Sequence, residues 1–187
     1  MTRTTVFLAV AMILAAATSL AQIPQPYAGM QNRPLKALSD EQLADLKEGR
    51  GMGLALAGEL NGYPGPKHVL ELAKELNLTD AQRERTQQLF DAMKAETIPL
   101  GQQLIAAETD LDRQFSGRTI TPASLTAATT TIGATQGTLR ATHLKYHLAM
   151  MDVLTPAQIA RYGELRGYGA AGPAGPFAEH AQSQEVR

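Results

Sequence analysis

Apolar side chains recur every three or four residues through two long stretches of the chain, which is the spacing of one face of an α-helix. The first stretch runs from Thr79 to about Phe115 and the second from Thr121 to about Asp152. Ser116-Gly117 breaks the pattern, and a five-residue turn between the two stretches makes the two helices antiparallel neighbours. No stretch shows the strict alternation of a β-strand, so the pattern predicts an all-α protein built on a long helical hairpin.

Shorter apolar patterns flank this hairpin and predict further helices. One covers 66–76 after the rigid turn Tyr-Pro-Gly-Pro at 63–66, and another begins at Thr155. A third covers 39–60, although it contains glycines at 49, 51 and 53. Pro99 interrupts the first long helix, where we expect a kink and no end.

The same helix-start motif occurs three times, as LSDEQ at 38–42, LTDAQ at 78–82 and LTPAQ at 154–158. In each copy the hydroxyl residue can cap the backbone N–H three positions on, and the glutamine can reach back to the backbone of the cap. Pro156 occupies the first helical position, where its missing N–H is tolerated. The motif therefore marks three helix N-termini.

The two ends of the chain differ from this helical region. Residues 1–21 have a basic residue, an apolar run and a small-residue cleavage site, so they read as a signal peptide with the mature chain starting at Gln22. Residues 22–37 form a Pro- and Gln-rich extended lead-in, 38–166 a single helical domain, and 167–187 a flexible Gly- and Ala-rich tail. An exported chain without cysteine fits the bacterial periplasm, with no stable membrane insertion after the signal is cleaved.

Charge and composition exclude several classes of function. The net charge is −1, and residues 66–166 carry 11 basic and 11 acidic side chains. Nothing here points to nucleic acid or to a strongly basic binding surface. No cysteine nucleophile and no Ser-His-carboxylate set is present, so we expect no enzyme and no obligatory cofactor.

Two histidines stand four residues apart near the end of the second long helix. At about 100° per residue, His143 falls on the stripe of Leu125, Ile132, Leu139 and Met150, and His147 lies roughly 40° to one side. Imidazoles at this spacing can bind one transition-metal ion such as Zn, Ni, Co or Cu. The further candidate ligands are His68 on the buried side of the 66–76 helix, Met151 and Glu96. Alternatively, the histidines are hydrogen-bonded core residues.

Leu144, Leu148 and Met151 form a second apolar strip about 100° from the first. A helix with two apolar strips needs two neighbours, and the long hairpin partner covers one of them. The second strip is a candidate surface for a client protein or for a second copy of the chain.

The paired LTDAQ and LTPAQ motifs in an exported helical chain resemble the Spy/CpxP family, which includes ZraP-like and CnrX-like periplasmic heavy-metal proteins. The resemblance spans roughly 66–166. It implies a helical hairpin that dimerises head to tail and has no enzymatic activity. CnrX-like relatives gather their metal from histidines on the first helix and a His-x-x-x-Met pair on the third. His147 and Met151 match that pair, but the residue four before His68 is Pro64.

Two functions follow as expectations. The first is metal binding through the histidines in metal resistance or sensing. The alternative is an ATP-independent holdase chaperone that shields apolar segments of unfolded envelope proteins. We expect a homodimer in either case, with unfolded clients or an envelope regulatory protein as its partner.

Overall fold

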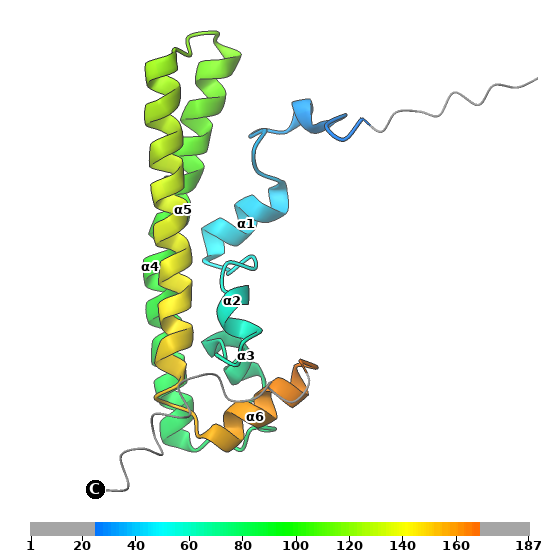
Figure 1. Cartoon of the computed structure of the whole chain (residues 1–187), viewed down its shortest axis with the longest axis vertical. Helices are drawn as coiled ribbons and strands as arrows, with labels where there is room; N and C mark the ends of the chain where they lie inside the picture. Colours follow the sequence, from blue (N-terminus) through cyan, green and yellow to red (C-terminus); the bar gives the residue numbers. More distant parts are fainter. Residues whose placement is uncertain (1–24, 169–187) are drawn as a thin grey trace, which may run out of the picture.

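The computed structural model describes residues 25–168, and these residues are helical without a β-strand (Figure 1). The predicted fold class is thus confirmed. In the described part of the chain, no helix has both the length and the apolar character needed to cross a membrane. The signal peptide and nearly all of the predicted tail lie outside the described residues. The elements in order are η1 (Met30–Asn32), α1 (Asp40–Glu48), α2 (Leu56–Glu59), α3 (Pro66–Glu71), α4 (Asp80–Ser116), α5 (Pro122–Met150) and α6 (Pro156–Leu165).

The α4–α5 hairpin forms the long axis of the molecule, as the sequence predicted (Figure 1). α4 contains 37 residues, so at about 1.5 Å per residue it is roughly 55 Å long. It continues through Pro99. The N-terminal elements lie along one side of the hairpin, and α6 crosses its lower end (Figure 1).

All three predicted helix-start motifs form capping boxes, with Ser39, Thr79 and Thr155 as the caps. The two later copies also contact each other. The Nε2 atom of Gln82 donates to the Oε1 atom of Gln158 at 2.8 Å and to a carbonyl after α5 at 2.9 Å. Because each glutamine caps its own helix and bonds the other, the motifs hold the starts of α4 and α6 together.

The prediction of one helix over 39–60 is wrong. α1 ends at Glu48, and its cap Gly49 has φ 68°, a left-handed conformation that suits glycine. Met52 and Gly53 also have positive φ, at 45° and 77°. The chain therefore turns repeatedly before the single turn of α2. The helix predicted over 66–76 is also shorter, since α3 ends at Glu71 and turns follow.

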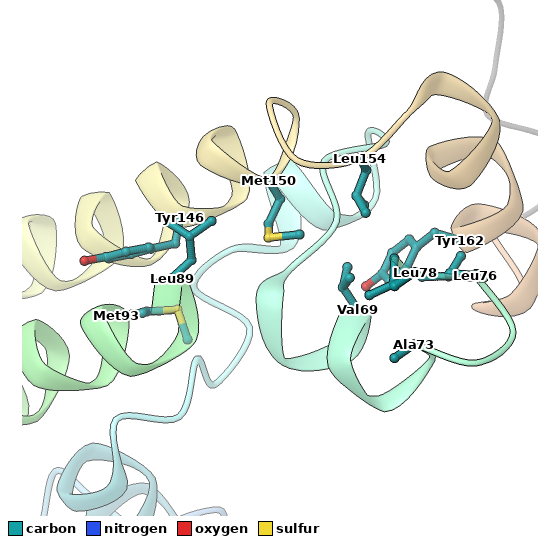
Figure 2. Packing of buried hydrophobic residues seen from close by; sticks show 10 residues of the cluster. All are labelled: Val69, Ala73, Leu76, Leu78, Leu89, Met93, Tyr146, Met150, Leu154 and Tyr162. Atoms are coloured by element: carbon teal, nitrogen blue, oxygen red, sulfur yellow. The ribbon is translucent and has the colours of Figure 1, made fainter. Parts of the chain in front are cut away.

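Two apolar clusters fill the structure. The lower cluster joins the hairpin to α3 and α6, with Val69, Met150 and Tyr162 almost completely buried (Figure 2). The upper cluster packs Leu46 of α1 against the hairpin. There α1 comes so close that a Cβ added to Gly101 of α4 would lie 2.3 Å from the carbonyl oxygen of Leu46.

The predicted apolar stripe of α5 is largely confirmed, because Ile132, Leu139, His143 and Met150 are buried. Leu125 is the exception and remains 38% exposed. It lies in the first turn of α5, which begins at Pro122. Phe115, at the same end, is exposed as well. At the tip, α4 and α5 have no further helix among residues 25–168 packed against them that would bury these side chains (Figure 1).

Candidate metal centre

His143 and His147 lie one turn apart near the end of α5 and are both buried, with exposed fractions of 2% and 8%. They line a cavity of about 530 Å³ between the hairpin and the 49–68 segment. His68 of α3 lines the same cavity. The structure therefore brings the three predicted histidines to one hollow.

His143 is held in its neutral form by its surroundings. Burial, together with a smaller contribution from the charge of His147, lowers the pKa of His143 to about 4. Its Nε2 atom is buried and has no hydrogen-bond partner. At physiological pH this side chain is a neutral imidazole with one nitrogen uncommitted, which is the form that binds a metal.

His147 is fixed in one tautomer by the backbone. Its Nδ1 atom lies 2.7 Å from the carbonyl oxygen of Tyr63. A carbonyl oxygen accepts hydrogen bonds and cannot donate them, so Nδ1 carries the hydrogen, and in the neutral ring the lone pair is on Nε2. Metal-binding histidines are commonly oriented in this way by a carbonyl on the second ring nitrogen.

The turn at 63–66 fits closely around the His147 ring. A Cβ added to Gly65 would lie 2.8 Å from Cε1 and 3.0 Å from Nε2 of His147. Gly65 has φ −85°, a value that any residue adopts, so it is the space and not the backbone that requires glycine. The rigid turn predicted from Tyr-Pro-Gly-Pro thus positions a candidate ligand.

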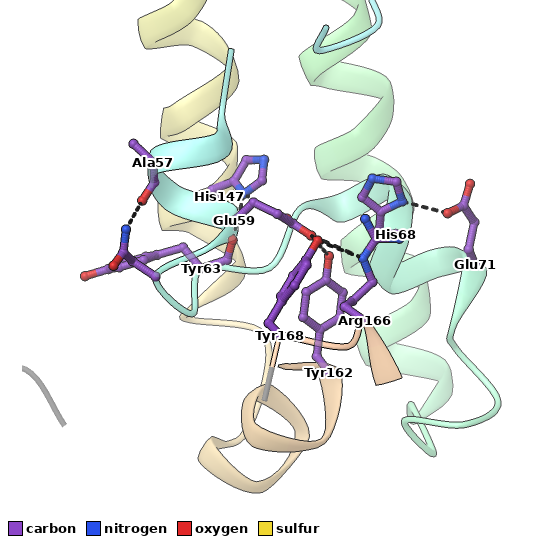
Figure 3. Close-up of polar contacts among 10 residues, drawn as sticks. Ala57, Glu59, Tyr63, His68, Glu71, His147, Tyr162, Arg166 and Tyr168 are labelled. Carbon is purple, nitrogen blue, oxygen red and sulfur yellow. Dashed lines mark hydrogen bonds and ion pairs between the residues drawn. The ribbon is translucent and has the colours of Figure 1, made fainter. Parts of the chain in front are cut away.

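Glu59 is a buried carboxylate of the cavity that the sequence did not reveal. It belongs to α2, is 6% exposed and lines the same cavity. Its Oε1 atom accepts hydrogen bonds from the hydroxyls of Tyr162 and Tyr168 and forms an ion pair with Arg166 at 3.4 Å (Figure 3). Its Oε2 atom has no hydrogen-bond partner and lies 3.7 Å from Nδ1 of His147.

The tyrosines beside Glu59 remain hydrogen-bond donors. Burial and the hydrogen bond to Glu59 raise the pKa of Tyr162 well above its usual range. Burial also raises the pKa of Tyr168. Both phenols therefore stay protonated, and together with Arg166 they fix one oxygen of the buried carboxylate. No local pattern could have indicated this, because the partners are more than 100 residues from Glu59.

His68 is less enclosed than the other two histidines, with 33% of its side chain exposed. Its Nδ1 atom lies 2.7 Å from Oε2 of Glu71, one turn along α3 (Figure 3). This hydrogen bond from His68 is the main cause that lowers the pKa of Glu71. His68 thus lies at the cavity with one nitrogen engaged by a carboxylate.

The remaining predicted ligands are not brought to the cavity. Glu96 interacts instead with Lys145 and with the hydroxyl of Tyr146, the latter at 2.8 Å. These two hydrogen bonds, that from Lys145 first, lower the pKa of Glu96. Met151 caps the end of α5 and is 36% exposed, outside the cavity lining. Lys145 holds Glu96 outside the cavity, and the structure gives no single cause for the exclusion of Met151.

The second apolar strip of α5 is covered only in part. Leu144 is half-buried against α2, where a Cβ added to Gly58 would lie 3.4 Å from its Cδ2 atom. Leu148 remains 59% exposed. α2 is therefore a neighbour of this strip, and Leu148 and Met151 stay accessible.

As the side chains stand, residues 25–168 contain no group of three or more His, Asp or Glu arranged around one ion position.

Comparison with known families identifies the chain. A family model described as heavy-metal resistance matches residues 52–161, which is more than half of the 187-residue chain. The match covers both later helix-start motifs, Glu59 and the three cavity histidines. Curated proteins and solved structures give no significant match. The matching family is a non-enzymatic resistance and sensing family of the wider Spy/CpxP-like group, so the resemblance seen in the sequence is confirmed at that level. The chain belongs to the heavy-metal resistance family.

Proposed function

We propose that this protein is a non-enzymatic periplasmic component of metal resistance or sensing that binds a transition-metal ion through His143 and His147. The observation that carries the proposal is the state of the two imidazole rings, one of which is oriented and the other kept neutral. His147 has its Nδ1 hydrogen bound by the Tyr63 carbonyl, and His143 is kept neutral by burial. Burial disfavours a proton on His143, and the carbonyl orients the His147 ring, and both features suit imidazoles that bind a metal.

The orphaned Nε2 atom of His143 also fits a ligand role. A buried polar atom without a partner is costly by about 1–3 kcal/mol, and a bound ion would relieve that cost. Packed core histidines ordinarily satisfy both nitrogens. The metal ion would be the species that is sensed or sequestered, and the protein would supply the imidazole nitrogens and the cavity that bind it.

Calorimetric titration of the purified protein with zinc, nickel, cobalt and copper tests this function. We expect at least one of these ions to bind more tightly than about millimolar and to raise the melting temperature, because ions that bind the folded state stabilise it. His143→Ala and His147→Ala should each remove this stabilisation. His180→Ala changes a histidine of the tail predicted from the sequence and should not. If the wild type binds none of the four ions, or if the double variant His143→Ala/His147→Ala binds as the wild type does, the proposal is wrong.

A holdase chaperone is the second candidate function, supported by apolar side chains that stay exposed. Leu56 of α2 is 52% exposed, and Leu60, which follows α2, is 57% exposed. Leu148 of α5 is 59% exposed. Such a surface suits an apolar segment of an unfolded protein or the second copy in a homodimer. We expect Leu144→Ser with Leu148→Ser to weaken suppression of client aggregation and His143→Ala to leave it unchanged. Unchanged client aggregation with the wild type at equimolar ratio would exclude this function.

A further inference from the structure

We propose that Glu59 is the carboxylate ligand that completes the metal centre of His143 and His147. This inference rests on the proposed metal-binding function and adds the identity of the third ligand. The resulting donor set contains two imidazole nitrogens and one carboxylate oxygen. Such a set suits the borderline divalent ions zinc, cobalt and nickel, and it disfavours copper(I), which prefers sulfur.

The first support is that only one of the two carboxylate oxygens of Glu59 is hydrogen-bonded. Oε1 accepts hydrogen bonds from Tyr162 and Tyr168 and forms an ion pair with Arg166. Oε2 accepts no hydrogen bond, although the residue is only 6% exposed. A ligating carboxylate shows this division, since hydrogen bonds to one oxygen orient the other toward the ion. A carboxylate that served only to anchor α6 would gain stability from a donor on each oxygen.

The second support is where the unsatisfied atoms gather. Between residues 25 and 168, the buried side-chain nitrogen and oxygen atoms without a partner are Oε2 of Glu59 and Nε2 of His143. Both residues line the same cavity, as does His147, whose Nδ1 atom is 3.7 Å from Oε2 of Glu59. A single cation bound there would satisfy both atoms together.

A simple ion pair between Glu59 and His147 explains the geometry less well. Nδ1 of His147 is 3.7 Å from Oε2 but only 2.7 Å from the Tyr63 carbonyl. The hydrogen on Nδ1 is therefore already donated, and the carboxylate oxygen gains no hydrogen bond from this ring. Oε2 remains available to another cation.

The segment that carries Glu59 has the means to close on the histidines. α2 is a single turn between Gly53 and Gly62, whose φ values are 77° and 83°. Glycine tolerates such conformations and the changes between them. Residues 25–168 contain no preassembled three-ligand group, so metal binding by Glu59 would require α2 to shift along α5.

Zinc titration with difference infrared spectroscopy tests the assignment, because zinc binding to a carboxylate shifts its stretching bands. We expect zinc to shift a carboxylate band in the wild type and not in Glu59→Gln, whose zinc affinity should fall at least ten-fold. Glu75→Gln removes an exposed carboxylate outside the cavity and is the matched control, with affinity and band unchanged. Glu59→Asp keeps the carboxylate on a shorter side chain and should retain the band at reduced affinity.

The outcomes separate this inference from the proposed function. If the wild type binds no metal, the proposed function fails. If the wild type binds zinc but shows no carboxylate shift, or if Glu59→Gln keeps both shift and affinity, Glu59 is not a ligand while the histidine site stands. A loss of binding in His68→Ala together with full binding in Glu59→Gln would assign the third ligand to His68. Should Glu59→Gln fail to fold, the zinc affinity of Glu59→Asp decides, because an affinity equal to that of the wild type would contradict the assignment.

Discussion

The Nδ1 atom of His147 and the backbone carbonyl oxygen of Tyr63 lie 2.7 Å apart, although 84 residues separate them in the chain. This hydrogen bond joins α5 to the turn between α2 and α3. It sets the tautomer of the ring, and Gly65 in the same turn leaves room for the ring's other nitrogen. The turn therefore fixes the position of the His147 ring, a candidate metal ligand.

Gly65→Ala should disturb the fit of this turn around the His147 ring. The new Cβ would lie 2.8 Å from Cε1 of His147, so the ring or the turn must shift. We expect a loss of about 1–3 kcal/mol in the free energy of unfolding, typical of overpacking, and weaker metal binding. Urea denaturation and zinc titration measure the two effects.

Gly133→Ala is the matched control for this change. Gly133 lies within α5, and an added Cβ would meet nothing within 4 Å. Alanine there should raise stability by about 0.5–1 kcal/mol, because glycine is a poor helix former. Equal effects of the two substitutions would show that the fit around His147 is not tight.

The stability of the protein should fall as the pH falls from about 6.5 to about 4, owing to His143. In the unfolded chain this histidine takes up a proton near pH 6.5, whereas burial lowers its folded-state pKa to about 4. Protons therefore favour the unfolded state in this window, and below it the loss stops growing. The full difference is roughly 3 kcal/mol.

Urea denaturation across this pH range checks the prediction. The free energy of unfolding of the wild type minus that of His143→Leu should fall by that amount between pH 7.5 and pH 4. His68→Leu removes a half-exposed imidazole and should leave most of the wild-type pH dependence in place. A constant difference between wild type and His143→Leu would mean that His143 is not desolvated.

The hairpin and its caps could be predicted because their causes are local. The three- and four-residue spacing of apolar side chains gives the buried face of α5, and Thr79 and Thr155 cap with glutamines three residues away. The inward orientation of His143 follows from the same spacing. These features depend on residues within one or two helical turns.

Glu59 could not be predicted, because its role depends on contacts with Tyr162 and Tyr168 at sequence separations of 103 and 109. The break at Gly49 also misled the helical pattern, since glycines can either continue a helix or end it. Leu125 was misplaced because apolar spacing gives the direction of a side chain but not whether another element reaches it.

Gly101→Ala should detach or displace α1. Its Cβ would lie 2.3 Å from the carbonyl oxygen of Leu46, and backbone cannot yield as a flexible side chain does. We expect a loss above about 2 kcal/mol and faster hydrogen exchange in α1 than in α4. Gly137→Ala, where an added Cβ meets nothing within 4 Å, should not destabilise. Unchanged exchange in α1 would contradict the close crossing of the two helices.

Tyr162→Phe should loosen α6 from the rest of the fold. Tyr162 is 1% exposed and donates to the buried Glu59, so the variant removes a hydrogen bond to a charged group while keeping the ring in the lower cluster. Such a hydrogen bond contributes about 1.5–3 kcal/mol. Tyr168→Phe removes the second phenol donor at a residue that is 36% exposed, and it should have a smaller effect. Urea denaturation gives both values, and hydrogen exchange should show the loss concentrated in α6. If the two variants are equally stable, Tyr162 does not carry the attachment of α6 to Glu59. If zinc restores the stability of Tyr162→Phe, the bound ion holds the Glu59 carboxylate in place of the missing donor.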